Sequence, residues 1–227
     1  MKSFLMIFIS AILSGACITF GATTFVLCNN GEFISKFAGA FMFCIGLYTI
    51  IHFNLWLYTG KVGYVLDNKP KYILEVLTCF IGNVLGGFLL SSLIAQTSII
   101  DTLRERCQQL VELKLNSNWY SILIMSMLCG VMIYLSVEGH KRAKYNLAKT
   151  IFAFMPIMLF ILCGFEHVIA NVTYFTYAGV FSAKALLYFF LMFIGNALGS
   201  ILFALLLKVI EKLNENKKEN IEVKEEN

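Results

Sequence analysis

Residues 164–171 of this chain read Gly-Phe-Glu-His-Val-Ile-Ala-Asn, so Glu166, His167 and Asn171 place a carboxylate, an imidazole and a carboxamide close together. No other Asp, Glu, Lys, Arg or His occurs between residues 150 and 183. Ionisable groups within so apolar a stretch are costly inside a membrane, and they usually face a bundle interior or a water-filled path. The pattern therefore indicates a transport site. The alternative is that Glu166 and His167 only hold two half-helices together.

The composition is that of a membrane protein. Of the 227 residues, 59% are hydrophobic and 14% are charged, whereas soluble domains have about 45–50% and about 25%. A helix needs roughly 20 residues to cross the bilayer. Six predominantly apolar stretches reach that length: Phe4–Leu27, Phe37–Gly60, Val76–Ile100, Leu115–Val137, Thr150–Ala183 and Ala185–Leu207. The sequence therefore predicts an all-α membrane protein with six transmembrane helices.

The distribution of Lys and Arg predicts the orientation of these spans. If both chain ends lie on one side, five of the 18 basic residues fall on the other side: Lys36, Arg104, Arg106, Lys114 and Lys184. Because cytoplasmic loops carry the excess of Lys and Arg, both termini are expected in the cytoplasm of a multi-pass cell-membrane protein. Residues 1–213 are expected to form a single transmembrane channel domain. Residues 214–227, which are almost without apolar side chains, are expected to be a disordered cytoplasmic tail.

A short motif recurs half a chain later. Ile-Gly-Asn-Val-Leu-Gly-Gly at 81–87 returns as Ile-Gly-Asn-Ala-Leu-Gly-Ser at 194–200, an offset of 113 residues. Each copy lies in the third span of its half, and three is an odd number, so the two repeats (about 1–100 and 115–213) must be inverted. The small residues predict close helix packing. The asparagine of each copy is expected to cross-link neighbouring helices by hydrogen bonds.

The second and fifth spans are predicted to be broken. Glu166 and His167 interrupt the fifth span, and the second ends in Leu-Tyr-Thr-Gly at 57–60. With the repeat offset, Thr59 corresponds to residue 172, close to His167. Inverted repeats usually place the substrate at the midplane between discontinuous helices. We therefore expect Thr59 and His167 to face each other across a path.

Together these residues resemble the formate/nitrite transporter family over nearly the whole chain. The likeness rests on the block at 164–171, the loop at 57–60, Lys149 and Pro156 in order before the Glu-His pair, and both Gly-Asn motifs. The resemblance implies an aquaporin-like fold with a pore in each protomer of a homopentamer. It also implies a channel for small monovalent anions, with formate the first expectation and hydrosulfide or nitrite the alternatives.

The resemblance also assigns residues to the pore. It puts His167, Thr59, Glu166 and Asn171 at the centre. It further implies an outer constriction, an inner constriction and a vestibule lysine, in that order: Phe43, Leu57 and Phe160; Leu47, Tyr58 and Ile133; and Lys114. The chain departs from the family at Gly130, where the family has an asparagine that helps to surround the histidine.

The chemistry of transport follows from the cost of burying charge. A bare anion in a medium of low dielectric constant costs many kcal/mol, whereas a neutral acid crosses cheaply. Lys114 would concentrate anions at the mouth through its field. His167 would donate a hydrogen bond or a proton. Direct protonation by His167 and proton uptake from vestibule water both stay open.

Two other classes compete with a channel for anions. A membrane enzyme would use Glu166 and His167 as acid and base, but the sequence has no His-Glu-x-x-His, Gly-x-Ser-x-Gly or paired-carboxylate motif. A cation channel would favour a ring of carboxylates, which the sequence lacks. We expect no catalytic residues, metal site, cofactor or nucleic-acid partner. The expected partners are a small anion, the lipid bilayer and further copies of the chain.

Overall fold

The computed structural model describes residues 2–225, and this range consists of helices joined by short loops. The elements are α1 (Lys2–Cys28), α2 (Phe33–His52), α3 (Tyr58–Lys61), the 3-10 helix η1 (Val62–Asp67), α4 (Lys71–Ile94), α5 (Ile100–Asn116), α6 (Trp119–Arg142), α7 (Asn146–Cys163), α8 (Val168–Ala178) and α9 (Ala183–Glu225). Six helices in this range are long and apolar enough to cross a membrane: Phe4–Cys28, Phe33–His52, Lys71–Ile94, Trp119–Arg142, Asn146–Cys163 and Ala183–Lys217. The all-helical membrane fold with six spans is thereby confirmed.

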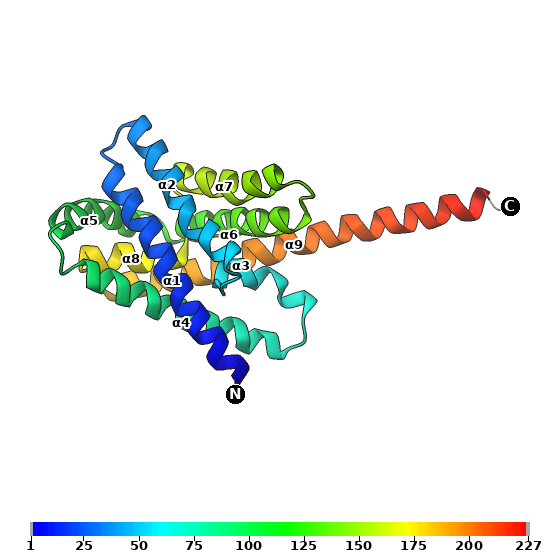
Figure 1. Cartoon of the computed structure of the whole chain (residues 1–227), viewed down its shortest axis with the longest axis horizontal. Coiled ribbons are helices and arrows are strands. Elements are labelled where there is room, and N and C mark those ends of the chain that lie inside the picture. The colour runs from blue at the N-terminus through cyan, green and yellow to red at the C-terminus, as the bar shows by residue number, and fades with distance from the viewer. Residues whose placement is uncertain (1, 226–227) are drawn as a thin grey trace.

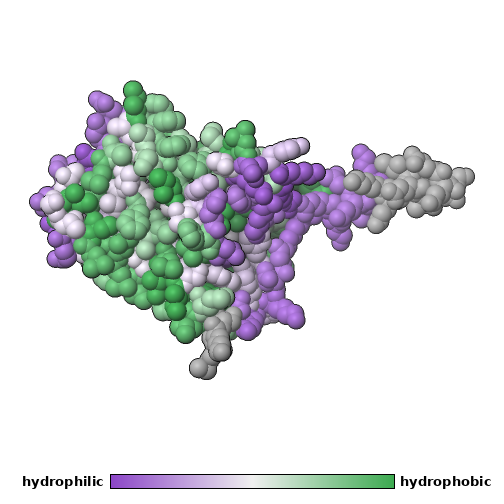
Figure 2. Space-filling model, viewed as in Figure 1, coloured by the Kyte–Doolittle hydropathy of each residue, from purple (hydrophilic) through white to green (hydrophobic). Residues whose placement is uncertain are grey.

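The outer surface of the helical body is apolar. Figure 2 shows hydrophobic residues over the middle of the body, with hydrophilic residues at one end and around the base of the projecting α9. Side chains as large as Ile34 and Leu186 expose 79% and 71% of their surface. A soluble monomer rarely exposes so extensive an apolar surface. This surface fits the hydrocarbon core of a bilayer.

The two halves of the chain repeat the same helix pairings. α1 packs against α4 and α2 in the first half, and α6 packs against α9 and α7 in the second. The short helices cross over, because α8 contacts α4 while η1 contacts α9. Figure 1 shows these helices gathered into one body from which the end of α9 projects alone.

One face of the body carries the starts of α1 and α4 and the end of α6. The Lys71 ammonium lies over the Phe4 ring, 5.4 Å from its centroid. Arg142 forms an ion pair with Glu211 of α9. We call this face the terminus side. Since α6 ends here after 24 residues, it begins on the opposite side, whereas α1 begins on the terminus side. The equivalent helices of the two halves therefore run in opposite directions.

Glycines set how closely the equivalent helices approach. A Cβ atom added to Gly15 of α1 would collide with the carbonyl oxygen of Asn83 in α4, and one added to Gly130 of α6 would collide with that of Asn196 in α9. Without side chains at these crossings, the backbones lie in direct contact, as small residues permit in membranes. The helices that carry the repeated motif are thus locked to their partners at its asparagines.

Two helical rods are interrupted. α2 ends at His52, Asn54 has a positive φ of 51°, and helix resumes at Tyr58. α7 ends at Cys163, where Gly164 takes a left-handed φ of 72°, and α8 begins after His167. Gly164 suits this position because it has no Cβ to penalise a positive φ. Each predicted span here is thus a long helix followed by a short one.

The structure contains a helix that the sequence analysis did not predict. α5 covers Ile100–Asn116 between two spans, where the sequence analysis had only counted Arg104, Arg106 and Lys114 as charges on the side opposite the chain ends. Leu103, Cys107 and Val111 are buried on one face. Their spacing of four residues is the signature of an amphipathic helix, and the frequent charges between them hid it.

The C-terminal end also differs from the prediction. We expected residues 214–227 to be disordered, whereas α9 continues as a helix to Glu225. Residues 208–225 contain neither Gly nor Pro. Extending an existing helix adds one hydrogen bond per residue without a new nucleation step. A polar composition therefore did not end the helix, and its last turns project from the body (Figure 1). Residues 226–227 lie outside the described part of the chain.

Candidate functional site

His167 is the N-cap residue of the short helix α8, whose first residue is Val168. Its backbone is extended (φ −95°, ψ 115°), and its Nδ1 atom accepts a hydrogen bond from the backbone N–H of Ala170 at 3.1 Å. The imidazole thereby fills the role that Ser, Thr or Asp usually has at the start of a helix. The side chain is 2% exposed. A backbone requirement of α8 therefore fixes the orientation of the ring.

The other ring nitrogen contacts the second break in the fold. His167 Nε2 lies 2.9 Å from Oγ1 of Thr59, in α3. Because Nδ1 accepts a hydrogen bond, the neutral ring carries its proton on Nε2 and donates it to the Thr59 oxygen. The structure thus brings together the two residues that the repeat offset paired. The neutral histidine is a hydrogen-bond donor at this point.

The repeated asparagines hold both breaks in place. Asn83 accepts from the backbone N–H of Tyr58, the first residue of α3, at 2.7 Å. Asn196 accepts in the same way from Val168, the first residue of α8, at 2.9 Å. The amide of Asn83 also donates to the carbonyl groups of Ala11 and Trp56, and that of Asn196 to those of Ser126 and Glu166. Polar backbone groups that a broken helix would leave unpaired are thereby satisfied inside the bundle.

Glu166 is buried in a polar cluster beside the histidine. Its Oε2 atom lies 2.5 Å from Nζ of Lys114 and accepts from Nδ2 of Asn171 at 2.9 Å. The Asn171 amide also donates to the carbonyl oxygen of His167. The side chains of Glu166 and Lys114 are 4% and 14% exposed. The positive charge of the predicted vestibule lysine is therefore largely balanced by a buried carboxylate.

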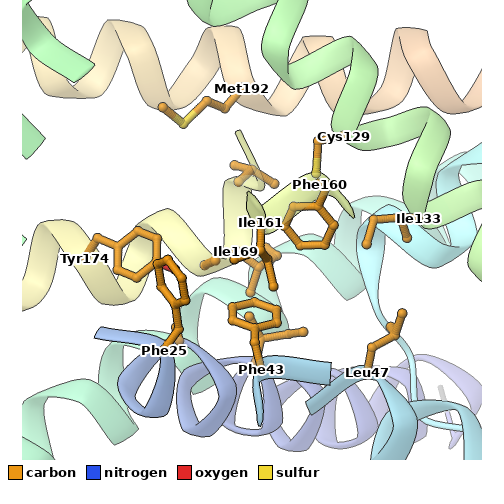
Figure 3. Packing of buried hydrophobic residues seen from close by; sticks show 14 of the residues in the cluster. Phe25, Phe43, Leu47, Cys129, Ile133, Phe160, Ile161, Ile169, Tyr174 and Met192 are labelled. Carbon is orange, nitrogen blue, oxygen red and sulfur yellow. The ribbon is translucent and has the colours of Figure 1, made fainter. Parts of the chain in front are cut away.

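Aromatic rings pack against His167 on one side. The ring of Phe160 lies 5.8 Å from the imidazole, and the ring of Phe43 meets Phe160 edge-on, also at 5.8 Å between centroids. Figure 3 shows the Phe43 side chain pointing from α2 toward those of α7, with Leu47 further along α2. Two of the three residues predicted for the outer constriction, Phe43 and Phe160, therefore pack against each other, and Phe160 also packs against His167.

The remaining predicted constriction residues are all buried but have different surroundings. Leu47 and Leu57 line one cavity on the terminus side, and Ile133 is buried in α6. Tyr58 packs its ring against Phe193 at 4.9 Å, and its hydroxyl donates to the carbonyl of the same residue. The Tyr58 side chain is thus held by α9.

Two cavities end against the two breaks. One, with a volume of about 290 Å³, is lined by Gly164 and Phe165 at the end of α7 and by Lys36 and Lys114. The other, of about 150 Å³, lies on the terminus side, where Lys61 among others lines it next to the second break. His167 and Thr59 lie where the breaks meet. Each cavity therefore reaches one of the two breaks and has lysine in its wall.

Gly130 has a packing role. The sequence analysis took it as a missing polar neighbour of His167, but a side chain here would run into the α9 backbone at Asn196. Gly130 corresponds in this respect to Gly15 in the first half. The close crossing of α6 and α9 requires a glycine.

The described residues contain no group of three or more His, Cys, Asp or Glu side chains that could hold a metal ion. The sequence analysis did not assign several basic residues to the walls of the two cavities. Lys36 lines the larger cavity and donates to the carbonyl of Leu162. Lys61, His140 and Lys141 line the smaller one. In the sequence these residues had no signal beyond their charge.

Comparison with known proteins identifies the family. A family model described as "Formate/nitrite transporter" matches residues 1–210. The chain belongs to the formate/nitrite transporter family. Its relatives are channels and transporters, which sets aside the membrane enzyme that we had considered.

One curated relative is "Formate channel FocA" of Haemophilus influenzae (strain ATCC 51907 / DSM 11121 / KW20 / Rd), with 26% identity over 184 residues. The match covers 72% of this chain and 63% of the relative, so the chain spans less than two thirds of the length of that protein.

Two solved structures share the fold. A "Pentameric formate channel with formate bound" has a TM-score of 0.74 and 18% identity, and the match covers 95% of this chain and 98% of the other. An "FNT family ion channel" has a TM-score of 0.77 and 19% identity, with coverages of 88% and 87%. At such low identity the likeness shows the fold alone, and the chemistry must be argued from the residues present.

Proposed function

We propose that this member of the formate/nitrite transporter family is a channel for small monovalent anions, formate first, which pass His167 as the neutral acid or together with a proton. One observation carries the proposal. A buried contact between His167 and Thr59 joins the two helix breaks, and a cavity lined in part by lysine ends against each break. The curated relative and one of the solved structures are both formate channels, which supports formate as the substrate.

The energetics favour a neutral species at the centre. Phe43 and Phe160 are 1% and 3% exposed; Phe43 packs edge-on against Phe160, which stacks on the His167 ring. Leu47 and Ile133 are equally buried. An ionised carboxylate would lose its hydration between such side chains at a cost of many kcal/mol. A hydrated ion such as chloride cannot gain a proton and is excluded, as in other hydrophobic constrictions.

The hydrogen bonds of His167 favour the role of donor over that of proton carrier. A second proton on the ring would sit on Nδ1 and break the hydrogen bond from Ala170. It would also place a positive charge at the N-terminus of α8, where the helix dipole is unfavourable to cations. We therefore propose that the anion takes its proton from vestibule water. His167 and Thr59 then offer hydrogen bonds to it as it passes.

Assembly and orientation complete the proposal. The exposed apolar surface and the likeness to a pentameric channel support a homopentamer with one pore in each protomer. The excess of Lys and Arg on the terminus side supports a cytoplasmic location for both chain ends. Cross-linking in mild detergent should saturate at five copies, and saturation at another number would refute the pentamer.

The test of the function is anion flux into proteoliposomes that contain the purified chain. Uptake of formate, nitrite and hydrosulfide is compared with uptake of chloride. For variants of His167, the matched control is His52→Asn, because His52 is an exposed histidine. We expect formate uptake that increases as the external pH falls, with no chloride uptake. If nitrite or hydrosulfide is taken up faster than formate, that anion would replace formate as the proposed substrate, and the protein would still be a channel for small monovalent anions. Flux no greater than in empty liposomes would refute the channel.

A further inference from the structure

Two histidines from different halves of the chain lie side by side on the terminus side, and the proposed mechanism uses neither of them. His52 is the last residue of α2, and His140 lies in the last turn of α6. Their ring centroids are 6.1 Å apart. His52 is exposed, and His140 is partly exposed and lines the smaller cavity. The pair is therefore open to ions from the solution on this side.

The hydrogen bonds of the two rings leave one free nitrogen on each. Nδ1 of His52 lies 3.0 Å from the carbonyl oxygen of Tyr48, and Nδ1 of His140 lies 3.1 Å from that of Lys149. A carbonyl oxygen only accepts, so each neutral ring carries its proton on Nδ1 and has an unprotonated Nε2. Histidines that bind metals usually donate their other N–H to such a group, which orients the ring. Both imidazoles can therefore act as ligands through Nε2.

The spacing of the rings fits one metal ion between them. A Zn²⁺ ion bonds an imidazole nitrogen at about 2.1 Å, which puts the ion roughly 3.2 Å from the ring centroid. Two rings that share an ion can then have centroids up to about 6.4 Å apart. The 6.1 Å between His52 and His140 lies within this reach. Their planes are inclined by 66°, so the two rings are not stacked face to face.

The helix ends favour a cation at this point, whereas nearby lysines oppose it. α2 and α6 both end beside the pair, and the C-terminus of a helix carries a partial negative charge. Lys61 and Lys141 line the same cavity as His140, and their charges repel a metal ion. The described part of the chain offers no third His, Cys, Asp or Glu to the pair. We therefore expect binding of moderate affinity, with water in the remaining coordination positions.

We propose that His52 and His140 form a binding site for a divalent transition-metal ion that prefers imidazole ligands, such as Zn²⁺ or Cu²⁺. The ion bonds the Nε2 atoms of both rings. It links the end of α2, the helix that precedes the first break, to the end of α6 in the second half of the chain. The site is separate from the proposed passage of anions past His167, and its test does not depend on transport.

A packing role for the two rings makes a different prediction. The ring centroid of Tyr48 lies 4.0 Å from that of His52, and aromatic contacts of this kind stabilise a side chain without any ligand. In that case no metal binds through these rings. Free thiols are a second source of metal binding, since thiolates are good ligands for Zn²⁺, and Cys163 is an exposed cysteine. The test must therefore separate histidine from cysteine.

Calorimetric titration with ZnCl₂ measures the site in the full-length chain, purified in detergent without a polyhistidine tag. The sequence has three histidines, and the third, His167, is buried. We expect one ion per chain with a Kd on the order of 10 μM, because the site has two of the four protein ligands of a structural zinc site. The absence of saturable binding would refute the site.

Variants of single residues assign the ligands. His52→Asn and His140→Asn should each weaken Zn²⁺ binding at least about tenfold. Cys163→Ser, which removes an exposed thiol, should leave the Kd unchanged. Unaltered binding in either histidine variant would refute the shared site, and loss of binding in Cys163→Ser would assign the metal to the thiol. Formate uptake is measured with EDTA present, so His52→Asn remains a valid control for variants of His167.

Copper tests the bridge in the unaltered chain, so this measurement does not depend on the folding of a variant. The protein is mixed with less than one equivalent of CuCl₂, and pulsed electron paramagnetic resonance counts the imidazoles bound to each Cu²⁺ ion. We expect two imidazoles in the unaltered chain and one in His52→Asn. A single imidazole in the unaltered chain would show that His52 and His140 do not share an ion and would refute the proposal.

Discussion

The ammonium of Lys114 lies 2.5 Å from the carboxylate of Glu166, across 52 residues of sequence. Both side chains are largely buried. The Asn171 amide donates a second hydrogen bond to the same carboxylate oxygen, Oε2. Such a pair stabilises little by itself, but the loss of one partner leaves a buried charge uncompensated.

This pair predicts strong coupling between the two residues. Lys114→Met should lower the free energy of unfolding by about 3 kcal/mol because it strands the Glu166 carboxylate. Adding Glu166→Gln should restore at least about 1 kcal/mol of that loss. Thermal unfolding of the single and double variants measures the coupling, and Lys184→Met is the control for charge alone. Additive effects would show that the pair is not formed.

Asn83 and Asn196, the two clamp asparagines that hold the helix breaks in place, should be equally important for folding. Asn83→Ala and Asn196→Ala each remove three hydrogen bonds with backbone groups, two of them at a helix break. At about 1 kcal/mol for each bond, we expect a loss of about 3 kcal/mol in either half. Asn68→Ala, at an exposed asparagine, should cost less than about 1 kcal/mol. A clear difference between the two clamp variants would contradict their structural equivalence.

For a substitution of Gly130, the structure and the sequence predict opposite results. From the sequence alone, an asparagine at this position would restore a polar neighbour of His167. Restoring the asparagine of the family with Gly130→Asn should disrupt folding, because its Cβ collides with the α9 backbone. Gly179→Asn is the matched control: Gly179 has a φ of +70° and open space around it, and asparagine tolerates this conformation. Size-exclusion profiles in detergent should show loss of the native peak for Gly130→Asn only. A native profile for that variant would refute the packing role.

Both chain ends are predicted to lie in the cytoplasm. A reporter that works only in the cytoplasm should therefore be active when it is fused after Asn227. A reporter that works only outside the cell should be active when it is inserted in the loop after Cys28. The excess of basic residues on the terminus side is the reason. Activity of the C-terminal reporter only outside the cell would reverse the proposed orientation of both cavities.

The contact at the centre could be anticipated from sequence because it depends on symmetry. The repeat offset placed Thr59 close to His167, and their side chains lie 2.9 Å apart. Inverted repeats bring equivalent breaks to the same depth in the membrane, so no long-range information was needed. The family resemblance likewise named Phe43 and Phe160, whose rings meet.

What the sequence could not supply was the pairing of charges. Glu166 had several lysines as possible partners, and only the position of α5 brings Lys114 to it. Lys61 and Lys141 entered the sequence analysis as counts for orientation, because nothing in their local sequence indicates a shared cavity. The continuation of α9 was missed for a different reason: composition alone does not register a helix that is already nucleated.

The central claim is that His167 acts as a neutral hydrogen-bond donor, and formate uptake by His167→Asn and His167→Phe tests it most directly. Asparagine can still cap α8 and donate a hydrogen bond, but it cannot titrate; phenylalanine can do neither. With folding checked by thermal unfolding, we expect uptake within about tenfold of the unaltered chain for His167→Asn, and none for His167→Phe. Complete loss in both variants would show that the imidazole itself must carry the proton, and unchanged uptake in His167→Phe would remove His167 from the mechanism.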